Sequence, residues 1–142
     1  MAENPLGGKI KLKPGTRAAV VNAPAGYTGS LIPLPEGASL SEVLDGRFDW
    51  IQAFVTGKAQ MEALLPTIFQ ALNPESLLWM CFPKGTSKVQ TDLTRDQGWD
   101  TLQRTDLKWV TLISIHSTWS AFCLRPYKPG ETRQTWWREP SG

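Results

Sequence analysis

The sequence predicts an α/β fold, a layered sheet whose earlier strands are parallel and whose last two strands form an antiparallel hairpin. Three observations predict it. Short apolar runs of strand length alternate with a segment of helical periodicity. Residues 76–82, "SLLWMCF", form the continuous apolar run expected of a central strand covered on both faces. Two strand-like runs, 108–116 and 119–126, are separated by only a few residues, which favours a hairpin.

In the first third of the chain, residues 17–22, "RAAVVN", are typical of a short buried strand. Residues 27–32 fit one or two helical turns, which "PLPEG" ends. Residues 38–44, "ASLSEVL", alternate weakly and leave both a strand and a short helix open.

In the middle of the chain, residues 49–55, "DWIQAFV", predict a strand between two glycines. Apolar residues then recur at helical spacing over 58–72, and Pro66 is expected to kink or divide that helix. "NPES", residues 73–76, predicts a closing turn before the central strand. Thr94 and Gln97 have the spacing of a capping box, and the helix they begin is expected to run to about Arg104, with Trp99 and Leu102 on its buried edge.

The length of 142 residues fits one domain. We expect a flexible lead-in at 1–14, the α/β domain at 15–127 and a polar tail at 128–142. The net charge of +2 is too small to predict nucleic-acid binding from overall electrostatics. Cys81 and Cys123 lie inside apolar runs, as in a reducing compartment, and no stretch has the roughly 20 apolar residues of a membrane span. We therefore expect a soluble, cytoplasmic protein with no membrane partner.

The order of strands and helices, with an Asn-Pro turn before the central strand and a closing hairpin, resembles the C-terminal half of the Rossmann-like class I methyltransferase fold. "LKPGTRAAVVNAPAGY", "PLPEG", "ALLPTIFQALNPESLLWMCFPKGTSKVQTDLTRD" and "TWSAFCLRP" are also similar to a family of small bacterial proteins of unknown function. The resemblance covers most of the chain. It implies a reduced Rossmann-like, three-layer fold, mostly parallel, and it implies no established reaction.

Two departures from true methyltransferases weigh against S-adenosylmethionine. A nucleotide-binding unit needs glycines after its first strand, whereas residues 22–26 read Asn-Ala-Pro-Ala-Gly, with one glycine and a proline that lacks an N–H. No acidic residue stands at the end of a clear second strand, since Glu36, Glu42 and Asp45 all fall in predicted turns. The sequence therefore predicts no cofactor.

Ligands of parallel α/β sheets bind beyond the carboxyl ends of the strands, which places Asn22, Tyr27 and the loop at 82–96 on one rim. In that loop two lysines offer cationic donors, one glycine permits close backbone approach, and hydroxyls lie between them. The sequence leaves open a site for a small anionic or phosphorylated ligand and a plain connection that caps a helix. The segment is not a P-loop, because Lys follows Ser and no upstream glycine is present. The candidate residues of this loop are Lys84, Gly85, Thr86, Ser87, Lys88, Asp92 and Arg95.

The sequence gives little support for a histidine-based, metal or paired-carboxylate site. His116 is the single histidine and is typical of a hairpin turn, and two cysteines at this spacing do not predict a metal site. Asp92, Asp96 and Asp100 share a helix face, the usual pattern of a solvated row.

Trp136 and Trp137 lie among basic residues of the tail, which argues weakly for single-stranded nucleic acid and more for a homodimer or protein interface. The sequence favours a non-catalytic binding module. The alternative is a divergent enzyme of methyltransferase-like fold, with Lys84, Lys88 and Arg95 stabilising negative charge and Asp92 or Asp96 carrying a proton.

Overall fold

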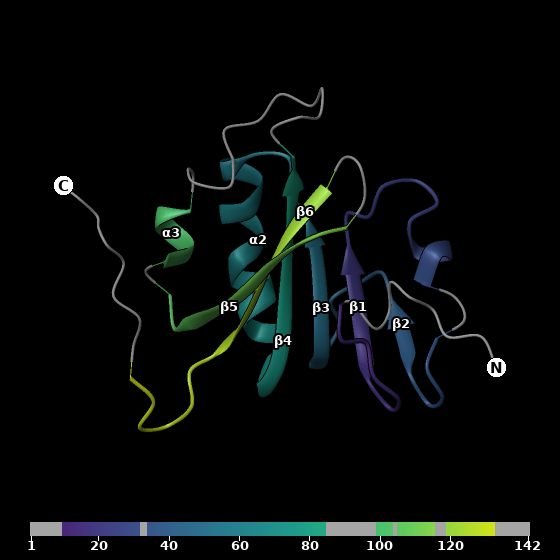
Figure 1. Cartoon of the computed structure of the whole chain (residues 1–142), viewed down its shortest axis with the longest axis horizontal. Coiled ribbons are helices and arrows are strands. Elements are labelled where there is room, and N and C mark those ends of the chain that lie inside the picture. Colours follow the sequence, from purple (N-terminus) through teal and green to yellow (C-terminus); the bar gives the residue numbers. More distant parts are fainter. Residues whose placement is uncertain (1–9, 32–33, 85–98, 104, 116–118, 133–142) are drawn as a thin grey trace.

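The computed structural model describes residues 10–31, 34–84, 99–103, 105–115 and 119–132 (Figure 1). Six strands, two α-helices and one short 3₁₀ helix follow one another within these residues. In chain order they are β1 (Arg17–Val21), the 3₁₀ helix η1 (Thr28–Leu31), β2 (Ser39–Ser41), β3 (Phe48–Phe54), α2 (Lys58–Ala71), β4 (Leu72–Pro83), α3 (Asp100–Gln103), β5 (Leu107–Ser114) and β6 (Trp119–Pro126).

The strands form one mixed sheet in the order β2-β1-β3-β4-β6-β5. The first four strands by sequence pair in parallel, whereas β6 is antiparallel to both β4 and β5. Strand β4 lies between β3 and β6 and is buried over most of its carboxyl-terminal half, as its continuous apolar run predicts. The structure thus confirms the α/β fold with a parallel part and a closing antiparallel hairpin.

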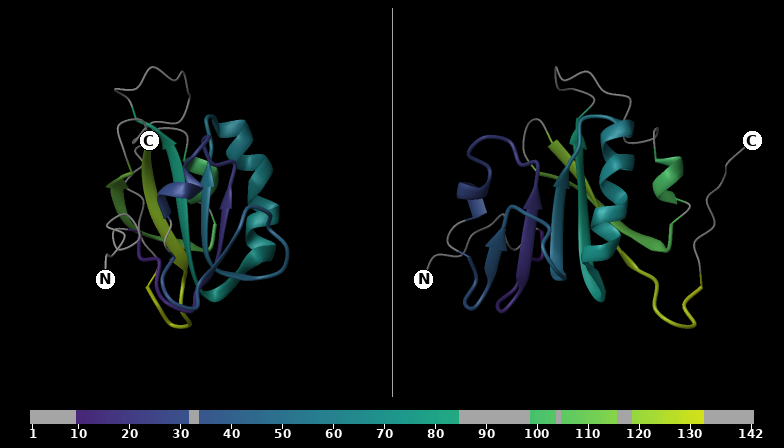
Figure 2. Two further views of the ribbon diagram at one scale, coloured as in Figure 1. Left: turned by 90° about the vertical axis from the view of Figure 1, so that its right-hand side faces the viewer. Right: turned by 180° about the vertical axis from the view of Figure 1, so that it is seen from behind.

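Helix α2 and helix α3 cover one face of the sheet (Figure 2). Met61, Leu65 and Ile68 of α2 recur at helical spacing and are buried against the sheet. Trp99 and Leu102 are buried in the same hydrophobic cluster. The sequence predicts this burial, since it places both residues on the buried edge of the helix that runs to about Arg104. The part of the predicted helix before Trp99 lies outside the described residues.

The opposite face is covered by η1 and by the chain that precedes β1. Ile10 and Leu12 are buried there together with Leu31 of η1. The indole N–H of Trp50 donates a hydrogen bond to the Ile10 carbonyl oxygen at 2.8 Å, which ties this segment to β3. The sheet therefore has one covering layer on each face, and residues 10–12 of the expected lead-in contribute to the second.

Three local expectations need correction or refinement. Residues 38–44 contain a strand, but β2 has only three residues. Helix α2 is continuous through Pro66 and is not divided there; this proline lies on the exposed side of the helix, so the buried residues Met61, Leu65 and Ile68 keep their packing. The predicted turn at 73–76 is part of β4, where pairing with β3 changes register.

That register change is held by a buried serine. The Ser76 hydroxyl donates to the Phe48 carbonyl oxygen at 2.6 Å and accepts from the Asn73 N–H at 2.8 Å. These bonds satisfy backbone groups that the interrupted ladder leaves without strand partners. Within the described part of the chain, no helix has the length and apolar character needed to cross a membrane.

Candidate functional site

The carboxyl ends of β1, β2, β3 and β4 lie at the same edge of the sheet because these strands are parallel. We call this edge the carboxyl rim. Its described residues are the turn 22–27 after β1, Glu42 after β2, Thr56 and Gly57 after β3, and Lys84 after β4. Open α/β sheets bind ligands at this edge, so it is the candidate site.

The turn after β1 is tight and depends on two left-handed residues. Asn22 has φ +59° and Gly26 has φ +78°, and the Tyr27 N–H closes the turn on the Pro24 carbonyl oxygen at 3.0 Å. Asparagine tolerates this region better than most residues, and glycine adopts it without penalty. Both residues are exposed, so the turn presents its backbone at the carboxyl rim.

Tyr27 points its ring into the core instead. Its side chain is 6% exposed, and its ring packs edge-to-face on Phe54 with centroids 4.7 Å apart. The hydroxyl donates to the side-chain oxygen of Gln52 at 2.9 Å. Burial raises the pKa of Tyr27 above its ordinary value, so the hydroxyl remains protonated. Tyr27 therefore anchors the turn to the hydrophobic core.

Glu42 follows β2 directly, which corrects the expectation that no acidic residue stands after a second strand. Ala19 of β1 pairs with Ser41, so Glu42 lies one residue further toward the carboxyl rim, beside the end of β1. The Ser41 hydroxyl donates to the Val43 carbonyl oxygen at 2.8 Å and accepts from the Val43 N–H at 3.1 Å. This small turn fixes the backbone on both sides of Glu42, whose side chain is exposed.

The sequence did contain a signal for Glu42. It lies about 20 residues after the start of the turn that follows β1, the interval at which dinucleotide-binding units place the carboxylate for the ribose hydroxyls. A strand of three residues shows no periodicity, so this interval was the available clue.

At the end of β3, Thr56 joins the start of α2. The Thr56 N–H donates to the Gln60 side-chain oxygen at 2.7 Å, and the Thr56 hydroxyl lies 3.2 Å from the same oxygen. Gly57, the N-cap residue, offers no side chain, and Gln60 of the first turn instead bonds to Thr56, the residue before the N-cap. The first turn of α2 is thereby fixed at the carboxyl rim.

Lys84 is the part of the predicted anion site that the structure describes. Its ammonium group donates to the Ser114 hydroxyl, which joins the end of β4 to the end of β5. The side chain is partly buried. The other candidates of the 82–96 loop, Gly85, Thr86, Ser87, Lys88, Asp92 and Arg95, lie outside the described residues, so the anion site stays a prediction.

Thiol and metal chemistry are not indicated among the described residues. Burial raises the pKa of Cys81 to about 12 and that of Cys123 to about 11, so both thiols are neutral near pH 7. The described residues contain no group of three histidine, cysteine or acidic side chains able to hold a metal ion. His116 lies outside the described residues.

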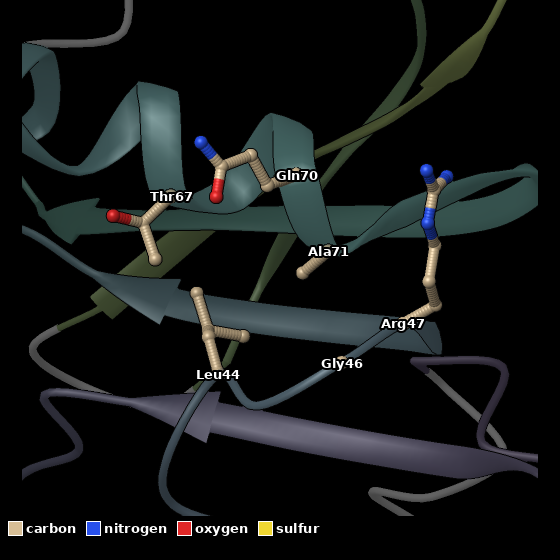
Figure 3. Close-up of a pocket in the computed structure, with 6 residues that line it drawn as sticks. All are labelled: Leu44, Gly46, Arg47, Thr67, Gln70 and Ala71. Carbon is tan, nitrogen blue, oxygen red and sulfur yellow. The ribbon is translucent and has the colours of Figure 1, made fainter.

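A cavity of about 240 Å³ opens away from the carboxyl rim, between the loop after β2 and the carboxyl-terminal half of α2 (Figure 3). Leu44 and Ala71 line it together with the polar side chains of Thr67 and Gln70. The Arg47 guanidinium donates to the Leu72 carbonyl oxygen at 2.7 Å, just after the end of α2. A cation at this helix end offsets the partial negative charge of the helix dipole, which gives Arg47 a structural role.

No family model matches the chain, and no curated protein matches it. Its fold is nevertheless shared with solved structures. A DhpI–SAH complex matches over 87% of this chain and 82% of its own, with 11% identity and a TM-score of 0.60. A SAM dependent methyltransferase from Aquifex aeolicus matches over 84% of this chain and 87% of its own, with 13% identity and a TM-score of 0.61. A ribosomal protein L11 methylase from Lactobacillus delbrueckii subsp. bulgaricus matches over 84% and 74%, with 14% identity and a TM-score of 0.53. At these identities the likeness shows the fold, which is the Rossmann-like fold of the methyltransferases.

Proposed function

We propose that the chain is a divergent enzyme of the methyltransferase fold that binds S-adenosylmethionine at the carboxyl rim. The observation that carries this proposal is Glu42, an exposed carboxylate placed directly after β2 and beside the end of β1. A carboxylate in this position accepts hydrogen bonds from the two hydroxyls of a ribose. The solved neighbours support the ligand class, since one is a complex with SAH and another is a SAM dependent methyltransferase.

The turn after β1 also distinguishes between nucleotide ligands. Pro24 has no N–H, and the Tyr27 N–H is used within the turn. Two of the six residues of this turn therefore offer no backbone donor to the phosphates that a dinucleotide places at this position. S-adenosylmethionine carries an adenosine but no phosphate, so it does not need that cradle. When bound, it supplies an activated methyl group.

Isothermal titration with S-adenosylhomocysteine tests the proposal. Wild-type protein is expected to bind it and to melt at a higher temperature in its presence. Glu42→Gln keeps the size of the side chain and removes the charge, and it is expected to weaken binding at least about ten-fold, the loss typical of a charge-assisted hydrogen bond. The matched control is Glu75→Gln, because Glu75 is also exposed but lies at the opposite end of β4. Absence of binding by wild-type protein would contradict the proposal.

A second candidate is a non-catalytic module for a small anionic ligand, as the sequence predicts for the 82–96 loop. The observation that favours it is Lys84, a cation held at the carboxyl rim by Ser114. The same titration with ADP and inorganic phosphate separates the two candidates. Stabilisation by phosphate-bearing ligands that is lost in Lys84→Ala with Lys88→Ala, without binding of S-adenosylhomocysteine, is the result expected of this module.

A further inference from the structure

Two polar side chains, Gln52 and Ser76, are fully buried among the described residues. Ser76 has a clear structural purpose, because both its hydrogen bonds satisfy backbone groups at the register change in β4. Gln52 differs. It lies in β3, and its side chain is hydrogen-bonded to two other side chains, the Tyr27 hydroxyl and the Cys81 thiol. A buried amide is costly unless it is hydrogen-bonded, so its presence in a central strand calls for a purpose other than packing.

The two partners fix the orientation of the Gln52 amide. The side-chain NH₂ donates to the Cys81 sulfur at 3.4 Å on the neighbouring strand β4. The side-chain oxygen then faces Tyr27 and accepts from its hydroxyl at 2.9 Å. Because burial keeps the Cys81 thiol neutral, this arrangement does not change near pH 7. Gln52 is thus a fixed acceptor in the middle of the sheet.

Tyr27 connects the Gln52 side chain to the turn at the carboxyl rim. It is the last residue of the turn, and its N–H makes the hydrogen bond that closes it. Between β1 and this closing bond, the turn has no other backbone hydrogen bond within the described part of the chain. Apart from the packing of the half-buried Ala23, its conformation therefore depends on where Tyr27 is held, by its ring on Phe54 and by its hydroxyl on Gln52.

We propose that Gln52 is a positioning residue for the ligand site, acting through Tyr27 to hold the turn at 22–26 in place at the carboxyl rim. The role in ligand binding rests on the proposed function. Nucleotide-binding units use several glycines to shape the turn after the first strand, whereas this turn has one. Here its conformation is maintained by the hydrogen bond between Tyr27 and Gln52 in the core. Gln52 does not itself reach the ligand, since its side chain is fully buried.

Hydrogen exchange of the full chain tests the positioning without any ligand. Gln52→Leu removes the amide at similar volume, and Tyr27→Phe removes the hydroxyl and keeps the ring. Both are expected to accelerate exchange of the Tyr27 amide, whose hydrogen bond closes the turn, by at least about ten-fold. The double variant is expected to be no faster than either single variant, because both remove the same bond. The exchange rate of the buried β4 amides measures global unfolding, and this contribution is subtracted from the rates at 22–27.

Ser76→Ala is the matched control, since it removes the other buried polar side chain. It is expected to accelerate exchange at 73–76 and to leave 22–27 unchanged. Titration with S-adenosylhomocysteine is then expected to show about ten-fold weaker binding for Gln52→Leu and Tyr27→Phe, and unchanged binding for Ser76→Ala.

The outcomes separate the two proposals. Unchanged exchange at 22–27 in Gln52→Leu overturns the positioning of the turn, whatever binds. Faster exchange with unchanged affinity overturns its role in the ligand site. Absence of wild-type binding, with faster exchange in the variants, contradicts the proposed function while the positioning of the turn stands.

Discussion

Glu131 accepts hydrogen bonds from two basic side chains of the β5–β6 hairpin. Its carboxylate takes two bonds from the Arg125 guanidinium, at 3.0 and 2.6 Å, and one from the Lys108 ammonium at 2.7 Å. The Lys128 N–H donates to the same carboxylate at 2.9 Å. The chain after β6 is thereby tied back to both strands of the hairpin. Bidentate contact with arginine is the geometry in which a surface ion pair contributes most.

These contacts predict a pH dependence of stability. Hydrogen bonds from Arg125, and then from Lys108 and Lys128, hold the pKa of Glu131 well below its ordinary value of about 4.5. A carboxyl group whose folded pKa is lowered stabilises the fold above its unfolded pKa, and this contribution is lost as the pH falls toward the folded pKa. Glu131→Gln is therefore expected to be less stable than wild type at pH 7, and the difference is expected to shrink below about pH 4.5.

Urea unfolding between pH 7 and pH 3 measures this difference. Glu36→Gln is the control, because Glu36 is exposed and takes part in the fold through its backbone carbonyl, which accepts from the Gly15 N–H. A difference between wild type and Glu131→Gln that stays constant with pH is incompatible with the ion pairs.

Single residues also show where sequence reasoning reached its limit at the site. A short apolar run that ends in turn residues is enough to predict that Asn22 and the turn after β1 lie at the carboxyl rim. Glu42 lies in a turn, as the sequence predicts, but the strand directly before it was not identified, because a strand of three residues leaves no pattern. Tyr27 was expected at the ligand, and the structure places its hydroxyl on Gln52. A side chain's direction after a tight turn depends on contacts distant in sequence, which a local pattern does not contain.

Among the elements, α2 begins without an N-cap side chain. Gly57 stands at that position, and the Gln60 side chain accepts the N–H of Thr56, the residue before the N-cap. We expect Gln60→Ala to lower the free energy of unfolding by about 0.5–1 kcal/mol, as for loss of one hydrogen bond. Gln70→Ala is the control, since Gln70 is an exposed glutamine of the same helix. Urea unfolding measures the free energy of unfolding of both variants. Equal decreases in the two variants would mean that the Gln60 contact does not stabilise the helix start.

Helix α2 and β4 also show why element boundaries were harder to predict than the elements themselves. The apolar spacing of Met61, Leu65 and Ile68 identified the helix, and their burial outweighs the hydrogen bond that Pro66 removes. Asn73 and Pro74 predict a turn from local preference alone. The strand nevertheless starts at Leu72, because the Ser76 hydroxyl bonds to Phe48 of the neighbouring strand and holds the irregular segment in the sheet. Both outcomes are decided by tertiary contacts.

At the scale of the whole molecule, the order of elements was sufficient to predict the fold, since parallel strands joined through a helix and a closing hairpin allow few arrangements. The covering of the second face was not predictable in the same way. No long helix is available for it among the described residues, and the lead-in carries only scattered apolar residues. Ile10 and Leu12 are nevertheless buried there, and Ile10 accepts the indole N–H of Trp50.

This arrangement makes the segment before β1 a structural part of the domain. The Ile10 side chain is fully buried, so Ile10→Ala leaves a cavity against the sheet and is expected to lower the free energy of unfolding by about 2–4 kcal/mol. Val43→Ala removes apolar atoms from a side chain that is 67% exposed and is expected to change stability by less than about 0.5 kcal/mol. Urea unfolding of both variants measures the contrast. If the two losses were similar, residues 10–12 would be a dispensable lead-in and the second face would be held by η1 alone; a loss confined to Ile10→Ala means that the sheet needs this segment as its second covering layer.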